Sequence, residues 1–323
     1  MSEAAEAVEV TDAVDVYFRS VAVMGTIVTV QIVGHGADQR ARDERATRVD
    51  AAFRWFLAIE AGCSRFDEHS EVSRLASRVG TPVPVSDMLF EAARFALAVA
   101  EETDGAFDPT VGHRMAAMGF DSEHRTGRRA QTALDGTEGV TYRDVRLDSE
   151  LKTITLLRPL MLDLGAVAKG LAVDMAAREL QPFGDFAVDA GGDLYFSGSN
   201  PLGQRWTVGI RHPRDEHDLL QTITMRDAAV CTSGDYARRA AAQHARPSSH
   251  HILDPRSGTP ASLLSSVTVV APTALVADAL ATAAFVLGPV EGVRLLERHG
   301  VDGLLVTPAL ERFVAAGALH CFQ

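Results

Sequence analysis

The sequence predicts an α+β fold with a substantial hydrophobic core. Short runs rich in β-branched and aromatic residues indicate strands; they are KTITLL (152–157), FAVDA (186–190), LYFSG (194–198), WTVGI (206–210), TITMR (222–226), SVTVV (266–270) and GLLVT (303–307). Helical patterns near 166–180 and 273–299 interrupt these runs, without the strict alternation of a parallel βαβ fold. The chain has 323 residues, of which 46% are hydrophobic, and this is enough to bury such a core.

The first third of the chain predicts one strand and two helices. VAVMGTIVTVQIV (21–33) is rich in β-branched residues and is expected to be a strand interrupted at Gly25. A helix follows over roughly 38–61, charged in its first half and apolar in its second. Ser86 as N-cap and Gly105 as terminator delimit the next helix. Residues 121–139 are polar, contain glycine and lack aromatics, so we expect a surface insertion with no catalytic residue.

Charge and cysteine content limit the possible classes of protein. The formal net charge of −12 repels phosphate backbones, so a general nucleic-acid binder is not expected. The three cysteines, Cys63, Cys231 and Cys321, form no CxxC pair and predict neither a disulfide framework nor a zinc site. The acidic N-terminus does not resemble a secretory signal. We therefore expect a cytoplasmic protein, with residues 1–18 flexible and 19–323 forming a single domain.

One apolar run, 271–287, approaches the length of a membrane span. It has 17 residues, contains Pro272 and places Asp278 near its middle. A carboxylate at that depth costs about 3 kcal/mol on insertion scales, and the length lies at the short limit for a span. The sequence therefore favours a buried helix and no membrane span.

Within that helix, Asp278 and Thr282 are four residues apart and so lie on one face, one turn from each other. Carboxylate and hydroxyl oxygens are hard ligands of the kind that Mg²⁺ uses together with substrate phosphates. The alternative is structural: an aspartate near a helix start, and a threonine that bonds back to its own turn. The segment alone does not decide between the two.

Four further segments carry polar residues in turns. LDLGAVAKGLAVDMAAREL (162–180) opens a helix whose free amides attract phosphate, although it lacks the spacing of a Walker loop or a GxGxxG fingerprint. TDGAFDPTVG (103–112) follows a helix, VDAGGDLYFSG (188–198) contains a hairpin turn, and SHHILDPRSGTPA (249–261) combines two histidines with an arginine. Histidine can act as a base near neutral pH and arginine can clamp phosphate, yet each segment taken singly also fits an ordinary turn.

Together these segments resemble the ApbE family of FAD:protein FMN transferases. The resemblance covers roughly 23–288 and follows the chain in order through VMGT, SRFDEHSEVSRL (64–75), TDGAFDPTVG, LDLGAVAKGLAVD, DAGGDLYFSG, TSGDY (232–236), HILDPRSGTPA and SVTVVAPTALVADALATAAFVLG. It implies a two-lobed, T-fold-like mixed α/β architecture with FAD between interwoven lobes. It also implies Mg²⁺-dependent transfer of the FMN half of FAD to a serine or threonine hydroxyl of an acceptor flavoprotein, with release of AMP.

The resemblance also implies roles for single residues. Asp278, Thr282 and the backbone carbonyl of Ala166 match the family's metal ligands, and His251 matches the histidine that would activate the acceptor hydroxyl. The residues matching the family's FAD contacts are Met24 and Phe66 beside the flavin, Ala106, Phe107 and Asp108 along the molecule, Asp163 and Lys169 at the nucleotide, and Arg256. His250 is expected to face solvent, because adjacent side chains of an extended segment point to opposite sides.

The chain departs from the family pattern at 110–120, TVGHRMAAMGF, where His113 and Met118 replace the more usual proline and tryptophan. The resemblance implies an acceptor with a Ser/Thr-Gly-Ala-Thr target. The chain contains no such motif of its own, so modification is expected to act on another protein. Two alternatives remain at this stage: an enzyme that hydrolyses FAD to FMN and AMP at the same site, and a flavin-binding protein without enzymatic activity.

Overall fold

The computed structural model describes residues 15–34, 36, 38–122, 127, 129–130, 137–236 and 250–322. Its strands are β1 Val16–Val23, β2 Thr26–Val33, β3 Val83–Pro84, β4 Val145–Asp148, β5 Thr153–Leu156, β6 Phe186–Ala190, β7 Leu194–Ser197, β8 Trp206–Arg211, β9 Leu219–Met225, β10 Ala228–Gly234, β11 Leu253–Asp254, β12 Thr259–Pro260, β13 Ser266–Ala271, β14 Asp302–Val306 and β15 Arg312–Ala315. Its α-helices are α1 Gln39–Cys63, α2 Glu71–Ala76, α3 Asp87–Glu102, α4 Gly112–Ala117, α5 Gly165–Leu180 and α6 Ala274–Arg298.

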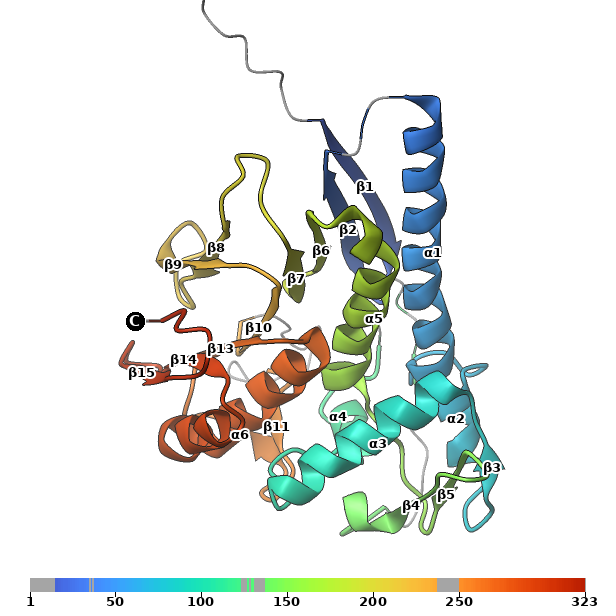
Figure 1. Ribbon diagram of the computed structural model, residues 1–323. Helices are drawn as coiled ribbons and strands as arrows, with labels where there is room; N and C mark the ends of the chain where they lie inside the picture. Colours follow the sequence, from blue (N-terminus) through green and yellow to red (C-terminus); the bar gives the residue numbers. More distant parts are fainter. Residues whose placement is uncertain are drawn as a thin grey trace, which may run out of the picture.

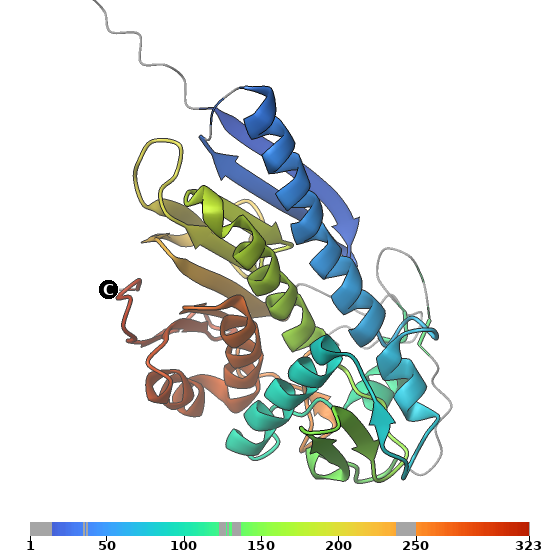
Figure 2. The ribbon, with the colours of Figure 1, turned by 45° about the vertical axis from the view of Figure 1, so that its right-hand side comes forward.

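An eight-stranded sheet in the order β1-β2-β6-β7-β10-β13-β14-β15 forms the larger lobe. Neighbouring strands are antiparallel throughout, including β2 against β6 and β10 against β13, which pair residues far apart in the chain. Helices α1, α5 and α6 lie on one face of this sheet, with α5 in the middle (Figures 1 and 2). The order of the strands therefore brings the start of the chain and its last third to either side of α5.

Alternating side chains fill both faces of the large sheet. On the helix side, Val28, Val30, Val188 and Cys231 belong to the main core. On the other side, Val33, Ala187 and Val230 pack with the β8–β9 hairpin in a second core. All six residues of β13 and all five of β14 are buried, as expected for strands covered on both faces.

The smaller lobe contains α2, α3 and α4 and a three-stranded sheet in the order β3-β5-β4. These elements lie together at the lower end of the molecule in Figure 1, away from the outer ends of β1 and β2. Their residues, 71–156, are inserted between α1 and α5 of the larger lobe. The loops that join the two lobes consequently lie near the N-terminal end of α5.

Helix α6 is long and apolar enough to cross a membrane by length and composition, and it is the one such helix among the described residues. In its most apolar stretch of 18 residues, 61% is buried, because the helix packs against β10, β13 and β14. Gly288, with φ of 82°, and Pro289 kink it near the middle. These features identify α6 as a core helix of the protein.

The structure confirms most predicted elements and corrects two. FAVDA is strand β6, and Ser86 caps α3 by accepting from the Leu89 amide at 3.3 Å. The predicted strand at 21–33 is interrupted at Gly25 as expected, but Met24 and Gly25 form a turn with φ of 52° and 69° that reverses the chain, so the two parts belong to the hairpin β1–β2. Strand β1 begins at Val16, so residues 16–18 pair with β2 and are not part of a flexible terminus; 1–14 lie outside the described residues. Most of the predicted surface insertion also lies outside them.

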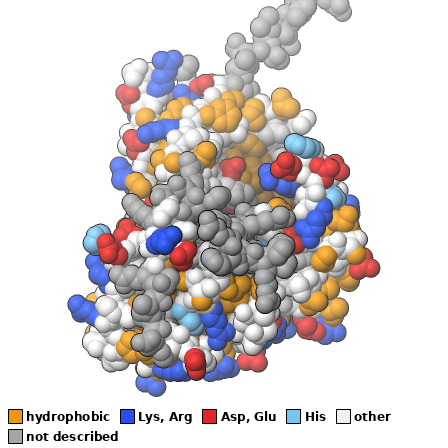
Figure 3. Space-filling view, turned by 180° about the vertical axis from the view of Figure 1, so that it is seen from behind, with side chains coloured by type: hydrophobic (Ala, Val, Ile, Leu, Met, Phe, Trp, Pro, Cys, Tyr) orange, Lys and Arg blue, Asp and Glu red, His pale blue; other side chains and the backbone are white. Residues whose placement is uncertain are grey.

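Charged side chains on the back of the molecule do not separate by sign. In Figure 3, acidic and basic side chains of the described residues alternate over this face, with hydrophobic side chains between them. The negative net charge is therefore not gathered into one acidic surface on the described part of this face.

Candidate functional site

The site is organised around the crossing of α5 and α6. A Cβ at Gly170 would lie 2.5 Å from the carbonyl oxygen of Ala274, so the two backbones approach as closely as glycine allows. One turn further along α5, the carboxylate of Asp174 accepts from the amides of Ala274 at 2.7 Å and Leu275 at 2.9 Å. Ala166 lies one turn before this crossing on α5, and Asp278 one turn after it on α6.

Asp278 and Thr282, the polar pair predicted on α6, lie toward the sheet. Asp278 is 7% exposed, and Thr282 lies next to strand β10, where its hydroxyl is 3.0 Å from that of Ser233. The hydroxyl of Thr282 therefore has a partner outside its own turn, which the structural alternative did not include. Burial raises the pKa of the Cys231 thiol on β10, and the negative charge of Asp278 raises it further.

The loop before α5 is tied to the loop after α1 by a buried arginine. Arg65, 6% exposed, donates Nε to Asp163 at 2.8 Å and Nη2 to the carbonyl of Phe120 at 2.7 Å. The other oxygen of Asp163 accepts from the amide of Gly165, the first residue of α5, at 2.9 Å. The Arg65 guanidinium also lies 4.2 Å from the ring centroid of Phe66. Arg65 thus fixes Phe66 and the start of α5 relative to each other.

The two adjacent histidines point in opposite directions, but not as predicted. His251 is half-buried, and its ring packs edge-on against Phe120 with centroids 6.5 Å apart. His250, expected in solvent, is 7% exposed: its Nε2 donates to the carbonyl of Ala261 at 2.7 Å and its ring packs against Phe285. The prediction for His250 is wrong because the opposite side of this segment is the core, where burial lowers the pKa of the imidazole.

The 103–112 loop is held against the strand-like segment before α5. The Asp163 amide donates to the carbonyl of Pro109 at 2.7 Å. Asp108 is 8% exposed and accepts from the Thr110 amide and hydroxyl and from the Tyr142 amide, although burial still raises its pKa. Ala106 and Phe107 are buried, so any ligand contact from them involves the backbone.

Two tight turns complete the site from the large sheet. Lys169 on α5 forms an ion pair with Asp193, which is almost fully buried at the β6–β7 turn. Gly191 in that turn has φ of 67°, and a Cβ there would overlap the hydroxyl of Thr26. Met24, two residues before Thr26, donates its amide to Glu60 at 3.0 Å. The β1–β2 turn, the β6–β7 turn and α5 are therefore in direct contact.

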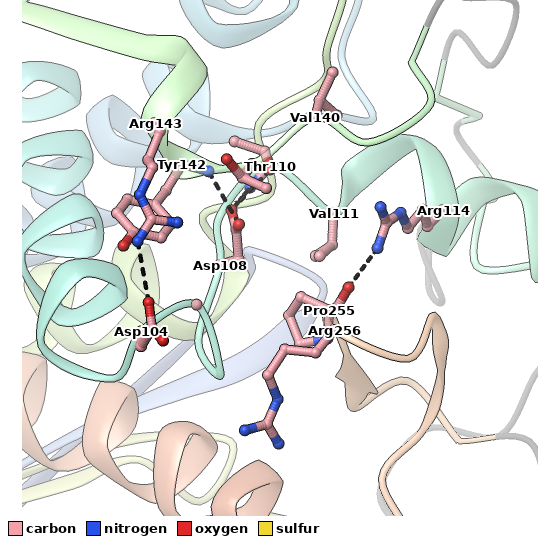
Figure 4. A pocket seen from close by; sticks show the side chains of 12 residues that line it. Asp104, Asp108, Thr110, Val111, Arg114, Val140, Tyr142, Arg143, Pro255 and Arg256 are labelled. Atoms are coloured by element: carbon pink, nitrogen blue, oxygen red, sulfur yellow. Dashed lines mark hydrogen bonds and ion pairs between the residues drawn. The ribbon is translucent and has the colours of Figure 1, made fainter.

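A cavity of about 300 Å³ opens beside the 103–112 loop. Figure 4 shows Asp104, Tyr142 and Arg143 on one side of it, and Arg114 and Arg256 near its other side. The Arg114 guanidinium donates to the carbonyl of Pro255 at 2.5 Å, which joins α4 to the turn after β11. Arg256 donates its Nε to Asp254 at 3.0 Å, and its guanidinium points away from Arg114. The cavity thus lies between segments of the two lobes and presents three guanidinium groups.

The oxygen atoms around the α5–α6 crossing would suit a hard cation better than a transition metal. Among the described residues, no cluster of three or more His, Cys, Asp or Glu side chains is arranged to hold a metal ion. Asp278, Thr282 and the Ala166 carbonyl offer one carboxylate, one hydroxyl and one carbonyl. Such a set leaves positions for substrate phosphates and water, which is the usual environment of Mg²⁺.

Four residues with clear contacts at the site were not predicted individually: Arg65, Phe120, Asp193 and Ser233. All four lie in segments that the sequence analysis quoted, SRFDE, TVGHRMAAMGF, DAGGD and TSGDY. Their partners lie between 24 and 98 residues away in the chain, so local patterns could mark the segment but not the contact. Met118, in place of the more usual tryptophan, packs with Met115, Phe120 and Leu253.

Comparison with known proteins gives a consistent result. Residues 24–305 match the model of the ApbE family. The FAD:protein FMN transferase of Haemophilus influenzae is 28% identical over 90% of this chain and 86% of its own length. The FAD:protein FMN transferase of Escherichia coli K12 is 30% identical over 90% of this chain and 84% of its own.

Solved structures give the same result for the fold. The ApbE protein of Thermotoga maritima superposes with a TM-score of 0.78 at 30% identity, covering 92% of this chain and 96% of its own. The flavin transferase ApbE of Vibrio cholerae gives a TM-score of 0.79 at 26% identity, covering 94% and 98%. The similarity therefore extends over both lobes.

Proposed function

Because the chain belongs to the ApbE family, we propose that it transfers the FMN half of FAD to a hydroxyl group of an acceptor protein. The acceptor oxygen attacks the phosphorus of the FMN phosphate, the bond to the bridging oxygen of the pyrophosphate breaks, and AMP leaves. The single observation that carries the proposal is the match of residues 24–305 to this family, since every segment of the candidate site lies within it.

The residues at the α5–α6 crossing fit the binding of Mg²⁺. Asp278, Thr282 and the Ala166 carbonyl would hold the ion, and Asp278 supplies the one negative side chain among them. A bound Mg²⁺ would neutralise negative charge on the pyrophosphate oxygens, including the charge that develops on the leaving oxygen. The chain's own part is to keep these three oxygens in place, which the close approach at Gly170 supports.

Residues around the crossing would orient FAD. Lys169, fixed by Asp193, carries a positive charge for the phosphates, and Asp163 and Arg65 close the other side of the helix start. Met24 and Phe66 would contact the flavin, while the backbone of 106–108, the carboxylate of Asp108 and Arg256 would line the nucleotide half, next to the cavity of Figure 4. The three guanidinium groups there suit the phosphate-bearing part of a nucleotide.

His251 would accept the proton of the attacking hydroxyl. Its ring is half-buried and rests against Phe120, whose carbonyl Arg65 holds, so its orientation is supported from behind. A positioned base of this kind contributes about 100-fold or more to a proton transfer. The acceptor would carry a Ser/Thr-Gly-Ala-Thr target, and this chain would act in trans.

The test is to incubate the protein with FAD and Mg²⁺, with and without a flavoprotein that contains a Ser/Thr-Gly-Ala-Thr segment, and to follow AMP and the acceptor's mass together. We expect the amount of AMP released to equal the amount of acceptor whose mass increases by one FMN. AMP formed at the same rate without acceptor would instead identify the protein as a hydrolase. FAD that is bound without formation of AMP would identify it as a flavin-binding protein.

The matched variant is Asp278→Asn, which keeps the size of the side chain but removes its charge. Transfer should fall about 100-fold or more, because a divalent cation contributes several kcal/mol to such a reaction and about 1.4 kcal/mol corresponds to a factor of ten. The melting temperature of the ligand-free protein should change little. An unchanged transfer rate would show that the cation binds elsewhere.

A further inference from the structure

Thr282 needs a partner for its hydroxyl proton if its oxygen is to face a cation. A hydroxyl has one donor hydrogen and two acceptor lone pairs, so an oxygen that binds a cation must direct its hydrogen elsewhere. In an α-helix, threonine can instead rotate and donate to the carbonyl one turn earlier, here that of Asp278. That rotation would turn the oxygen away from its present position.

In this structure the hydroxyl of Thr282 has a partner outside its own helix. Its Oγ1 is 3.0 Å from Oγ of Ser233 on β10. The contact joins residues 49 positions apart and bridges α6 to the sheet beneath it. It therefore competes directly with the bond that Thr282 could make to its own turn.

The position of Ser233 on β10 follows from strand alternation. Cys231, two residues earlier, lies on the helix side, with its thiol 3.7 Å from the Ala274 carbonyl. Thr232, between them, lies on the opposite side, where its hydroxyl is 2.9 Å from that of Thr268 on β13. The strand thus carries two similar hydroxyl–hydroxyl contacts on adjacent residues, but only the one at Ser233 involves α6.

We propose that Ser233 is a positioning residue that accepts the Thr282 hydroxyl proton and so keeps the Thr282 oxygen turned toward the cation. The proposal rests on the proposed function, in which Thr282 is a ligand, and adds a residue of β10 to that site. Ser233 itself does not touch the ion or the substrate. Its removal therefore weakens cation binding without removing a ligand.

The experiment measures Mn²⁺ as a probe of the site, by the loss of the free-ion electron paramagnetic resonance signal, in the presence of ADP, which offers a diphosphate but no flavin to transfer. Ser233→Ala should raise the dissociation constant for Mn²⁺ about 10-fold or more, the usual effect of losing a residue that orients a ligand. Ser233→Thr, which keeps the hydroxyl and suits a strand, should restore it to within about 3-fold of wild type.

Thr232→Val is the matched control, since it removes the neighbouring hydroxyl–hydroxyl contact of the same strand on the other face. It should leave Mn²⁺ binding unchanged. Equal weakening by Thr232→Val and Ser233→Ala would show a general effect on β10 and overturn the proposal, as would wild-type binding by Ser233→Ala.

One further variant, Asp278→Asn, separates this proposal from the proposed function. Asp278→Asn should lose the Mn²⁺ site, whereas Ser233→Ala should only weaken it. If wild type and Asp278→Asn bind Mn²⁺ equally, the cation site itself is misassigned and the role of Ser233 fails with it. If Asp278→Asn alone loses binding, the site stands and only the role of Ser233 is refuted.

Discussion

At the scale of single residues, the adjacent histidines His250 and His251 differ in role: the first is part of the core, and the second is the proposed base. His250 Nδ1 accepts from the Ile252 amide at 3.3 Å, so Nε2 carries the proton that is donated to Ala261. Both nitrogens are therefore used inside the core, and burial lowers the pKa of this ring, which favours the neutral form. His251, on the other side of the segment, is the ring that we propose for proton transfer.

We therefore predict that substitution of His251 lowers activity and that substitution of His250 lowers stability. His251→Gln should lower kcat for transfer about 100-fold or more while the melting temperature stays close to that of wild type. His250→Ala should lower the free energy of unfolding by about 1–3 kcal/mol, because the Ala261 carbonyl and the Ile252 amide lose their partner. Initial rates and chemical denaturation measure both quantities; a His250 variant that folds normally but fails to transfer FMN would reverse the assignment.

Gly170 sets the distance between α5 and α6. A methyl group there would lie 2.5 Å from Ala274 O and 2.7 Å from its carbonyl carbon, both rigid backbone atoms. Gly170→Ala should therefore destabilise the protein by about 1–3 kcal/mol by overpacking, although alanine is the better helix former by about 1 kcal/mol. Urea denaturation measures the difference.

Gly62 on α1 is the control for this substitution. A Cβ there would meet its nearest atom, Glu71 Oε1, at 3.5 Å, which is an ordinary contact. Gly62→Ala should leave stability unchanged or raise it by up to about 1 kcal/mol. Destabilisation of the same size in both variants would show that the contact at the crossing is not its cause.

At the scale of elements, Asp174 links two helices by capping one from the side of the other. Its carboxylate accepts from the first two amides of α6, where the helix dipole also favours negative charge. Burial nevertheless dominates and raises the pKa of Asp174 from 3.8 to about 6. The folded protein consequently holds a proton on this group more tightly than the unfolded chain does.

This difference predicts a pH dependence of stability. The contribution of Asp174 is complete below about pH 3.8 and is lost as the pH rises through about 6. The free-energy advantage of wild type over Asp174→Asn should therefore shrink by up to about 3 kcal/mol between pH 4 and pH 7. Denaturation curves of both proteins across this range test it, and a difference that grows with pH would contradict the sign.

The elements that could be predicted from sequence are those whose signals are local. Ser86 before an apolar periodic run gives a cap, and two glycines with φ of 67° and 100° at 191–192 give the β6–β7 turn. Met24 adopts φ of 52°, which is unusual for a side chain other than glycine, and this is why the hairpin at 23–26 was missed. The Asp174 cap joins residues 100 positions apart, and no local pattern encodes it.

The same distinction applies to the site across the whole molecule. The four-residue spacing on one helix predicted Asp278 and Thr282 as a pair, and the family resemblance predicted the other segments of the site. Neither predicted the contacts among these residues. Arg65 joins segments 98 and 55 residues apart, and Ser233 reaches α6 across 49. These contacts depend on the order of strands in the large sheet, which brings α1, α5 and α6 side by side.

Since the candidate FAD contacts come from both lobes, FAD should stabilise the molecule as one unit. Asp108 lies in a loop of the small lobe and Phe66 in the loop that leads from α1 into it, whereas Met24, Lys169 and Asp278 belong to the large lobe. A ligand at 100 times its dissociation constant adds about 2.7 kcal/mol to the free energy of unfolding, which corresponds to a rise of about 4 °C in Tm for a chain of this length. Calorimetry should show a single transition that moves by this amount with FAD and Mg²⁺.

Two controls identify what causes that rise. Riboflavin, which lacks the pyrophosphate, should raise Tm less at the same multiple of the FAD dissociation constant, because it reaches neither the cation nor the cavity beside Arg256. Asp278→Asn should lose the part of the rise that depends on Mg²⁺ and keep the remainder. If FAD instead splits melting into two transitions and shifts only one, its contacts are confined to one lobe, and the assignment of residues from the other lobe is wrong.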